Sequence, residues 1–317
     1  MTDRVIRIGT RGSRLARWQA DAVHRLLAKS HPGRRFELVL VSTAGDRDTG
    51  RPLSSFGGVG VFVKEIENAL LGGRIDLAVH SLKDLPSAQP DGLRIGAVLP
   101  REDPRDAFVA RAVRALEGLP QGARVGTSSV RRRAQLLHLR PDVQVVPIRG
   151  NVPTRVRKLE EEKLDGVILA RAGLVRLGMG DAITEALSPT IMLPAPGQGA
   201  IAVEIRAEDG EVAEMLRPLH DERTARCVAA ERAVMRGVGG GCHAPVGALA
   251  TVEDARLALE AVVASPDGRM LVRRSASGAA DEADSLGLAL ARELLEHGGE
   301  DILHALGQER MEARRDV

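Results

Sequence analysis

Cys242 lies in a glycine-rich turn that would keep its sulfur open to a reactant. The turn reads Gly239-Gly240-Gly241-Cys242-His243-Ala244-Pro245. The glycines keep side-chain bulk away from the sulfur, and the proline stiffens the exit of the turn. A thiol becomes a reactive thiolate only near positive charge, which the rest of the chain has to supply. On local grounds alone, a tight turn with an incidental cysteine explains the stretch equally well.

A candidate acid/base carboxylate occurs in the stretch His80-Ser81-Leu82-Lys83-Asp84-Leu85-Pro86, which follows a strand pattern at Ile75–Val79. Open α/β sheets bind their ligands at the carboxyl ends of their strands. Asp84, beside Lys83, is therefore placed to transfer a proton. The competing interpretation is a solvated turn.

Positive charge is concentrated in one segment of the chain. From Arg124 to Arg176 there are twelve Lys and Arg against five acidic residues, a net of +7, although the whole protein has a formal charge of only +2. Several of these arginines follow predicted strand ends or begin predicted helices, namely Arg131, Arg132, Arg133, Arg149, Arg155, Arg171 and Arg176. Guanidinium groups bind carboxylates bidentately, so this segment predicts a site for an anionic ligand.

Two strand-turn-helix units are expected to position these groups. Val5–Gly9 predicts a strand, Thr10-Arg11-Gly12-Ser13 a turn, and Ser13 the N-cap of the following helix. The buried face of that helix is expected to carry Leu15, Trp18, Ala22 and Leu26. Val125–Ser129 repeats the design ahead of Arg131. The backbone N–H groups at such a helix start form an anion site.

Proline-containing connectors at Pro100–Arg105 and Leu193–Ala200 divide the chain into three expected domains. The first is an α/β domain made of residues 1–99 and 200–217, and the second is an arginine-rich α/β domain over residues 100–199. A small α+β domain over residues 218–317 carries Cys242. The helical pattern around Cys227 predicts a buried thiol.

Composition argues against several other classes of protein. With only Cys227 and Cys242, the chain has neither a disulfide framework nor metal-ligand spacing. The segment Met1–Ile8 is too short and too charged for a signal peptide, and no apolar run reaches membrane-spanning length. We therefore expect a cytoplasmic protein without metal. Four Phe, one Trp and no Tyr leave little for stacking on nucleic-acid bases.

Several of these stretches, in fixed order, resemble the porphobilinogen deaminase (hydroxymethylbilane synthase) family over essentially the whole chain. They are Gly9–Ser13, His80–Pro86, Arg101–Ala107, Gly126–Arg132, Arg149–Asn151, Pro196–Ala200 and Gly240–Cys242. The resemblance implies an α/β fold with two periplasmic-binding-protein-like domains joined by two crossovers, plus a small C-terminal α+β domain. It also implies a dipyrromethane cofactor, built from the substrate and joined to Cys242 by a thioether.

The activity implied by the resemblance is a transferase reaction of tetrapyrrole and haem biosynthesis. Four porphobilinogen units are joined head to tail with loss of ammonia, and water then releases the linear product. Asp84 would assist departure of the amino group, stabilise the resulting azafulvenium cation and accept the proton lost by the attacking pyrrole. We expect a monomer with a small-molecule substrate and neither nucleic acid nor membrane as partner.

The resemblance also assigns the binding residues. Cofactor-binding residues besides Cys242 would be Ser81, Lys83, Asp84, Thr127, Ser129, Arg131, Arg132, Arg149, Gly150 and Arg155. The incoming substrate or the growing chain would contact Arg11, Ser13, Gln19, Arg149, Arg155 and Arg176.

Two other functions are compatible with parts of the pattern. Two α/β lobes with hinges also describe a solute-binding or sensor module, because a fold does not fix a function. Such a module needs neither Cys242 nor Asp84, and it is usually exported. A nucleic-acid binder using Arg131–Arg133 is disfavoured by the scarce aromatic residues and the near-zero net charge.

The chain departs from the family in the loop before residue 63. Related enzymes often have a Lys-x-Gly-Gly-Lys-Gly pattern, and Ser55 and Val59 occupy the two lysine positions here. We expect this loop to act through glycine flexibility and apolar contact by Phe62. Lysine at position 59 tests the role of charge: an unchanged Michaelis constant and turnover in Val59→Lys would count against one.

Overall fold

The computed structural model describes residues 4–43, 63–239 and 244–315. Cys242 and the loop with Ser55, Val59 and Phe62 lie outside these ranges, so the predictions on them stay predictions. The chain divides into two compact units, Met1–Asp103 with Gly199–Ala225 and Pro104–Gln198 with Arg226–Val317. Each unit is described by itself.

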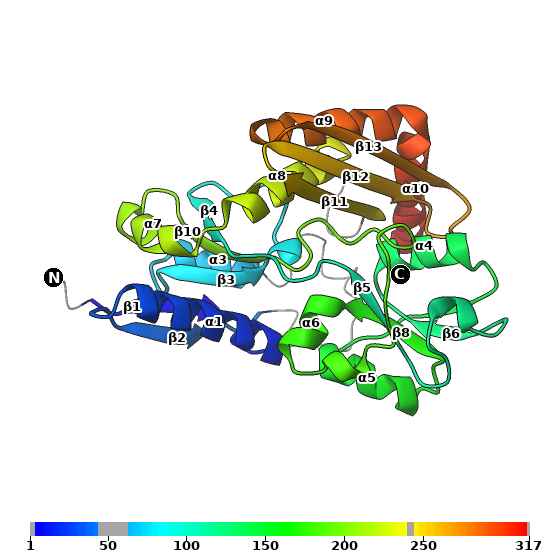
Figure 1. Cartoon of the computed structure of the whole chain (residues 1–317), viewed down its shortest axis with the longest axis horizontal. Helices are drawn as coiled ribbons and strands as arrows, with labels where there is room; N and C mark the ends of the chain where they lie inside the picture. Colours follow the sequence, from blue (N-terminus) through cyan, green and yellow to red (C-terminus); the bar gives the residue numbers. More distant parts are fainter. Residues whose placement is uncertain (1–3, 44–62, 240–243, 316–317) are drawn as a thin grey trace. The chain divides into compact units, whose positions relative to one another are not determined.

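The first unit contains a five-stranded sheet in the order β2-β1-β3-β10-β4 (Figure 1). Its strands are β1 (Ile6–Thr10), β2 (Phe36–Leu40), β3 (Leu77–Ser81), β4 (Leu93–Val98) and β10 (Ile201–Arg206). Strands β1, β2 and β3 are parallel, whereas β10 runs antiparallel to both of its neighbours, β3 and β4. The helices of this unit are α1 (Arg14–Ser30), α3 (Lys64–Leu71) and α7 (Gly210–Leu216).

Helix α1 begins as the sequence predicts but buries a different face. The Ser13 side chain accepts a hydrogen bond from the backbone N–H of Ala16, which confirms it as the N-cap. The buried residues are Gln19, Ala20, Val23 and Leu27. Leu26, expected in the core, is 41% exposed. Trp18 does pack, partly buried, against the same core, but the buried stripe runs through Ala20, Val23 and Leu27, so the predicted face is rotated from the buried one.

The second unit contains a sheet with the same pattern of strand directions. Its order is β7-β6-β8-β5-β9. The strands are β5 (Asp106–Ala110), β6 (Arg124–Gly126), β7 (Gln144–Val146), β8 (Gly166–Ala170) and β9 (Glu185–Ala186). Here β7, β6 and β8 are parallel, and β5 is antiparallel to β8 and β9. Its helices are α4 (Val130–Leu139), α5 (Val152–Glu161) and α6 (Arg171–Arg176).

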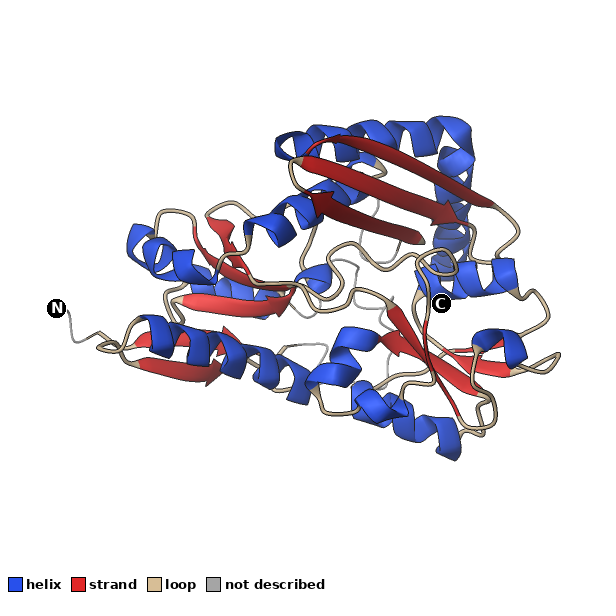
Figure 2. Ribbon diagram, viewed as in Figure 1, coloured by secondary structure: helices blue, strands red, loops and turns tan. Residues whose placement is uncertain are grey.

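The same unit contains a smaller antiparallel sheet of β11 (Val246–Glu253), β12 (Arg256–Ala264) and β13 (Leu271–Ala279). Helices α8 (Glu222–Gly237), α9 (Ala283–Leu294) and α10 (Glu300–Arg315) accompany it, as Figure 2 shows. Residues from all three helices pack with the sheet in one apolar core, which includes Cys227 at 6% exposure. The predicted burial of Cys227 is thus confirmed. The fold class is confirmed as well: two α/β parts, each built on a five-stranded sheet, and a small α+β part.

Contacts to backbone carbonyl groups join the two parts of the second unit. The N–H of Ala248 donates to the carbonyl of Pro194 (3.0 Å), and His138 Nδ1 lies 2.8 Å from the carbonyl oxygen of Gly268. Two apolar clusters lie within residues 107–192, and a further cluster lies within residues 227–302. The division into three domains stays a proposal.

Candidate active site

The turn that carries Asp84 is held by its backbone and its apolar neighbours. Strand β3 ends at Ser81 and passes into a short 3-10 turn, Leu82–Asp84. The N–H of Leu82 donates to the carbonyl of Ala200 (3.0 Å), and that of Leu85 donates to the carbonyl of Leu82 (3.1 Å). The Leu82 and Leu85 side chains are buried, whereas Asp84 is exposed. The turn therefore presents a carboxylate to solvent from a fixed backbone.

A polar pair, with Gln19 buried and Ser81 half-buried, ties α1 to the end of β3. Gln19 Nε2 donates to Ser81 Oγ at 2.9 Å, and Ser81 Oγ donates to Gln19 Oε1 at 3.2 Å. Gln19 is only 2% exposed. The two predicted ligand-binding residues thus bind each other, which fixes the strand end that leads to Asp84.

The predicted residues of the first unit gather at one edge of its sheet. Strands β1 and β3 are parallel neighbours, so the turn after β1, with Arg11 and Ser13, and the turn after β3, with Lys83 and Asp84, lie at the same edge. Arg11, Ser13 and Lys83 are half-buried there. Cationic and hydroxyl side chains at that edge suit an acidic ligand.

In the second unit the turn after β6 is held by a set of short hydrogen bonds. The N–H of Thr127 donates to the carbonyl of Val146 (2.9 Å), and the hydroxyl of Ser128 donates to the carbonyl of Ile148 (2.6 Å). Thr127 Oγ1 accepts from the N–H of Ser129 (3.2 Å), whose own hydroxyl caps α4. The start of α4 is therefore anchored to the carboxyl ends of β6 and β7.

Gly150 follows β7 in a conformation that other residues rarely adopt. Its φ is +114°, and a Cβ there would lie 2.6 Å from Cγ2 of Thr154. Its carbonyl accepts a hydrogen bond from Arg155 Nε (2.8 Å), which fixes that guanidinium beside the half-buried Arg149. Arg176 ends α6, so a whole short helix separates it from the carboxyl end of β8.

Arg131 and Arg132 are buried and both bind Asp106. Arg131 Nη1 donates to Asp106 Oδ2 at 2.7 Å, and Arg132 Nη2 donates to Asp106 Oδ1 at 2.8 Å. The arginine side chains are 5% and 6% exposed, and the Asp106 side chain is fully buried. Gln198 Nε2 also donates to Asp106 Oδ1, at 2.8 Å. Asp106 was missed as a site residue because an acidic residue does not fit a search for anion binders, although it lies within the quoted stretch Arg101–Ala107.

The charges in this cluster do not cancel. Burial alone would raise the pKa of Asp106, but the charges and hydrogen bonds of Arg131 and Arg132 outweigh burial and hold that pKa below its ordinary value. Burial lowers the pKa of Arg131. Two guanidinium groups face one carboxylate, and the buried Nε of Arg131 has no hydrogen-bond partner among the residues that the structure describes. A surplus positive charge and an unsatisfied donor fit an anionic group.

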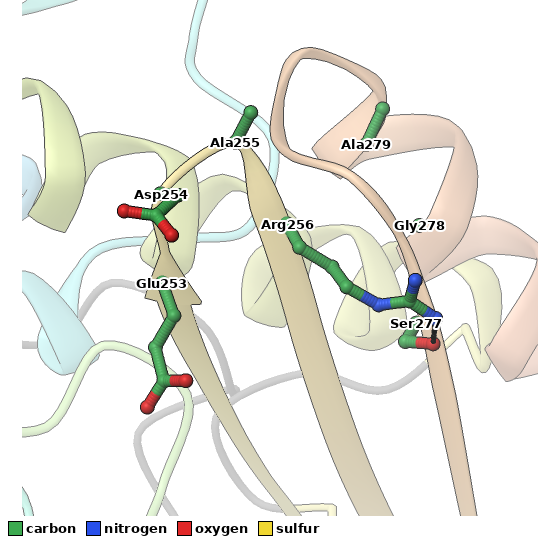
Figure 3. A pocket seen from close by; sticks show the side chains of 7 residues that line it. All are labelled: Glu253, Asp254, Ala255, Arg256, Ser277, Gly278 and Ala279. Carbon is green, nitrogen blue, oxygen red and sulfur yellow. Dashed lines mark hydrogen bonds between the residues drawn. The ribbon is translucent and has the colours of Figure 1, made fainter.

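Figure 3 shows a surface hollow in the second unit, on its three-stranded sheet. Glu253, Asp254, Ala255, Arg256, Ser277, Gly278 and Ala279 line it, at the turn between β11 and β12 and along β13. Arg256 Nη2 donates to Ser277 Oγ across it (2.8 Å). No residue predicted for the site lines this hollow, so we do not assign the chemistry to it.

Two family models match the chain almost end to end. One, described as "Porphobilinogen deaminase, dipyromethane cofactor binding domain", matches residues 6–214, and the other, "Porphobilinogen deaminase, C-terminal domain", matches residues 225–296. This chain belongs to the porphobilinogen deaminase family. The two strand-end clusters, around Asp84 and around Thr127, both lie within the matched cofactor-binding domain.

Curated porphobilinogen deaminases are similar over nearly their full length. That of Syntrophotalea carbinolica is 50% identical over 96% of this chain and 97% of its own. That of Pelotomaculum thermopropionicum is 51% identical over 96% and 98%, and that of Geotalea uraniireducens is 46% identical over 100% and 99%. A solved ABC-transporter periplasmic substrate-binding protein from Coxiella burnetii is 14% identical to this chain. The match covers 72% of this chain and 96% of that protein, with a TM-score of 0.43.

Within the described part of the chain, no three or more His, Cys, Asp or Glu side chains are grouped as metal ligands would be. In the same residues, no helix has both the length and the apolar character needed to cross a membrane.

Loss of the Asp106 charge is expected to destabilise the protein strongly. Asp106→Asn leaves two buried guanidinium groups without a counter-charge, which costs about 3–5 kcal/mol of unfolding free energy in comparable buried pairs. Urea unfolding measures the loss. The matched control is Glu161→Gln, which removes a carboxylate from an exposed pair with Arg157 and should change little. Equal effects of the two substitutions would contradict this view of the cluster.

Proposed function

We propose that this chain is a porphobilinogen deaminase that joins four porphobilinogen molecules head to tail and releases hydroxymethylbilane. Each condensation releases ammonia, and water releases the product, so the enzyme is a transferase of tetrapyrrole biosynthesis. The observation that carries the proposal is the exposed carboxylate of Asp84, on a fixed turn at a strand edge, in a chain that matches the family over nearly its whole length.

The described side chains suit a dipyrromethane, which is a chain of two pyrroles with acetate and propionate groups. We propose that Cys242 bears it and that its carboxylates are held by Lys83, Arg149 and Arg155, with hydroxyls from Ser81, Thr127 and Ser129. The surplus charge of the Asp106 cluster and the unsatisfied Nε of Arg131 support this fit. When bound, the dipyrromethane supplies the pyrrole α-carbon to which the first substrate is added.

Arg131 and Arg132 act in this proposal through charge and position. Their shared hydrogen bonds to Asp106 hold both guanidinium groups against the start of α4. The N-terminus of α4 and the surplus guanidinium charge then attract a carboxylate to the Thr127–Ser129 turn. Gly150 contributes by letting the chain bend sharply, so that Arg149 and Arg155 share one strand end.

Asp84 performs the proton chemistry in this proposal. In each condensation the bond from the aminomethyl carbon of porphobilinogen to its nitrogen breaks, and a bond forms from that carbon to a pyrrole α-carbon. The departing nitrogen leaves as ammonia, and the α-carbon loses a proton. The Asp84 carboxylate stabilises the cation left when ammonia departs, accepts hydrogen bonds from pyrrole N–H groups and takes up the α-carbon proton.

The remaining predicted residues would hold substrate carboxylates or keep the strand ends in place. Arg11 and Arg176 supply guanidinium groups, and Ser13 fixes the start of α1 beside Arg11. Gln19 acts by holding Ser81. We further propose a cytoplasmic monomer that acts on a small molecule, with neither nucleic acid nor membrane as partner. The solute-binding alternative is not favoured, because the family match covers both the sheet units and the C-terminal domain.

The covalent cofactor is tested by the intact mass of the denatured protein. The wild type should exceed its sequence mass by two pyrrole units, and Cys242→Ser should match its sequence mass. Cys227→Ser is the matched control, since this second cysteine is buried on α8, and it should keep the excess. An unmodified wild type that gains no mass on incubation with porphobilinogen would refute the proposal.

Asp84→Asn is expected to lower kcat by about 100-fold or more, which is the usual contribution of a positioned acid/base group. The Michaelis constant for porphobilinogen should change much less. The thermal midpoint should be unchanged because the side chain is exposed. Asp91→Asn, at another exposed aspartate of the first unit, should leave kcat unaltered. A smaller loss of kcat in Asp84→Asn than in Arg176→Gln would show that the proton chemistry belongs elsewhere.

A further inference from the structure

Three ionisable side chains lie between α3 and the sheet of the first unit: His80 and Glu204 are buried, and Glu67 is half-buried. Leu77 and Val79 of β3 belong to the core that contains α1, whereas Ala78 belongs to the core beneath α3. Side chains alternate along a strand, so His80 lies on the α3 face. The same alternation holds on β10, where Val203 and Ile205 pack in the α1 core and Glu204 therefore faces α3.

His80 and Glu204 form a buried pair across two strands. His80 is opposite Ala202 in the β3–β10 register, so Glu204 is its diagonal neighbour on the same face. His80 Nε2 lies 3.2 Å from Glu204 Oε2, with side chains 4% and 0% exposed. The distance is that of an ion pair, but the atoms do not meet in hydrogen-bond geometry.

Glu67 is the third member and comes from α3, which packs on β1, β3 and β10. Among the described residues, the buried Oε1 of Glu67 and both buried carboxylate oxygens of Glu204 have no hydrogen-bond partner. Two neighbouring ionised carboxylates with buried, unsatisfied oxygens are unfavourable. The described residues offer no metal site that would relieve this.

A proton on Glu67 removes the conflict. Burial, followed by the negative charge of Glu204, raises the pKa of Glu67, and His80 opposes the shift. Besides Glu67, α3 carries Lys64 and Glu65, and neither contributes to the shift. The third strand under α3, β1, has a single charged residue, Arg7, which binds Asp76. Glu204 on β10 and His80 on β3 are thus the charged groups that act on Glu67 among the described residues.

We propose that Glu67 is a protonated acid at neutral pH, and that the buried pair of His80 and Glu204 beside it positions the Asp84 turn. His80 is separated from that turn by Ser81 alone, and the next contact of the turn, from Leu82 to Ala200, is made with the segment leading into β10. Glu204 and His80 are therefore positioning residues. This role rests on the proposed function, whereas the proton on Glu67 does not.

Infrared spectroscopy of the holoenzyme tests the proton directly. At neutral pH the wild type should show the C=O stretch of a protonated carboxyl group, and the band should be absent in Glu67→Gln. Glu65→Gln, at a neighbouring position of α3, is the matched control and should keep the band. Failure to find a band that depends on Glu67 would overturn the proposal.

The pH dependence of stability provides a second test with a definite sign. A carboxyl group with a raised pKa contributes stability that is fully present below the pKa of the unfolded chain and is lost as pH rises through the folded pKa. The Gln side chain cannot ionise. Glu67→Gln should therefore gain in urea midpoint relative to the wild type as pH rises from about 5 to about 9. An ordinary ion pair of Glu67 with His80 predicts a loss at neutral pH, which would overturn the proposal.

Steady-state kinetics tests the positioning role. Glu67→Gln should keep kcat within about twofold of wild type, because it imitates the protonated acid. Glu204→Gln should lower kcat by about 10- to 100-fold through misplacement of Asp84, with a much smaller change in the Michaelis constant. Glu204→Asp, which keeps the charge, should recover part of the loss.

The outcomes separate the two proposals. A normal kcat in Glu204→Gln would overturn the positioning role. If Glu204→Gln does not fold, the infrared and pH results on Glu67→Gln still decide where the proton lies. A wild type that bears no pyrroles and does not consume porphobilinogen would instead remove the proposed function and leave the Glu67 measurements standing.

Discussion

The contact of Asp106 with Arg131 and Arg132 is the interaction on which the second unit depends. It connects the first residue of β5 to the first turn of α4. Gln198, in the connector Leu193–Ala200, also donates a hydrogen bond to Asp106. Two guanidinium groups could not be buried this deeply without a carboxylate, because burial penalises each charge separately. One carboxylate for two cations leaves a surplus, so the same contact that stabilises the fold also sets the sign of the charge offered to a ligand.

In the first unit, hydrogen bonds and apolar packing fix the turn that carries Asp84. Its central group, Asp84, is an exposed carboxylate whose backbone is fixed by Leu82, Leu85 and the Gln19–Ser81 pair. At the far end of the same sheet, the buried Asp76 side chain binds Arg4, Arg7 and Arg206. Burial would raise the pKa of Asp76, but hydrogen bonds from Arg7 and the contact with Arg4 outweigh burial and lower it to about 2. Ionic contacts thus stabilise the end of the sheet away from the candidate site, whereas hydrogen bonds and apolar packing fix the end that leads to Asp84.

Much of the fold was predictable, because local patterns carried it. The Ser13 cap, the strand expected at Val5–Gly9 and the burial of Cys227 each depend on a few neighbouring residues. Strand β5 and strand β11 were not predicted. Asp106 begins β5 directly after a charged connector, and β11 follows a stretch rich in glycine with a proline at its end, so residues typical of turns obscure both starts. The site was predictable as a set of strand ends. The partner of Arg131 was not, since a contact across 25 positions leaves no local trace.

The placement of β10 has a consequence for how the protein is made. This strand lies between β3 and β4, with hydrogen bonds to both, yet it is the last strand of its sheet to leave the ribosome. Until residues 201–206 have been synthesised, β3 and β4 have no common partner, and the end of β3 that bears Asp84 lacks its contact with Ala200. The nascent N-terminal segment therefore carries two open strand edges while the whole second sheet is being produced, and a chain cut off before β10 would expose them permanently.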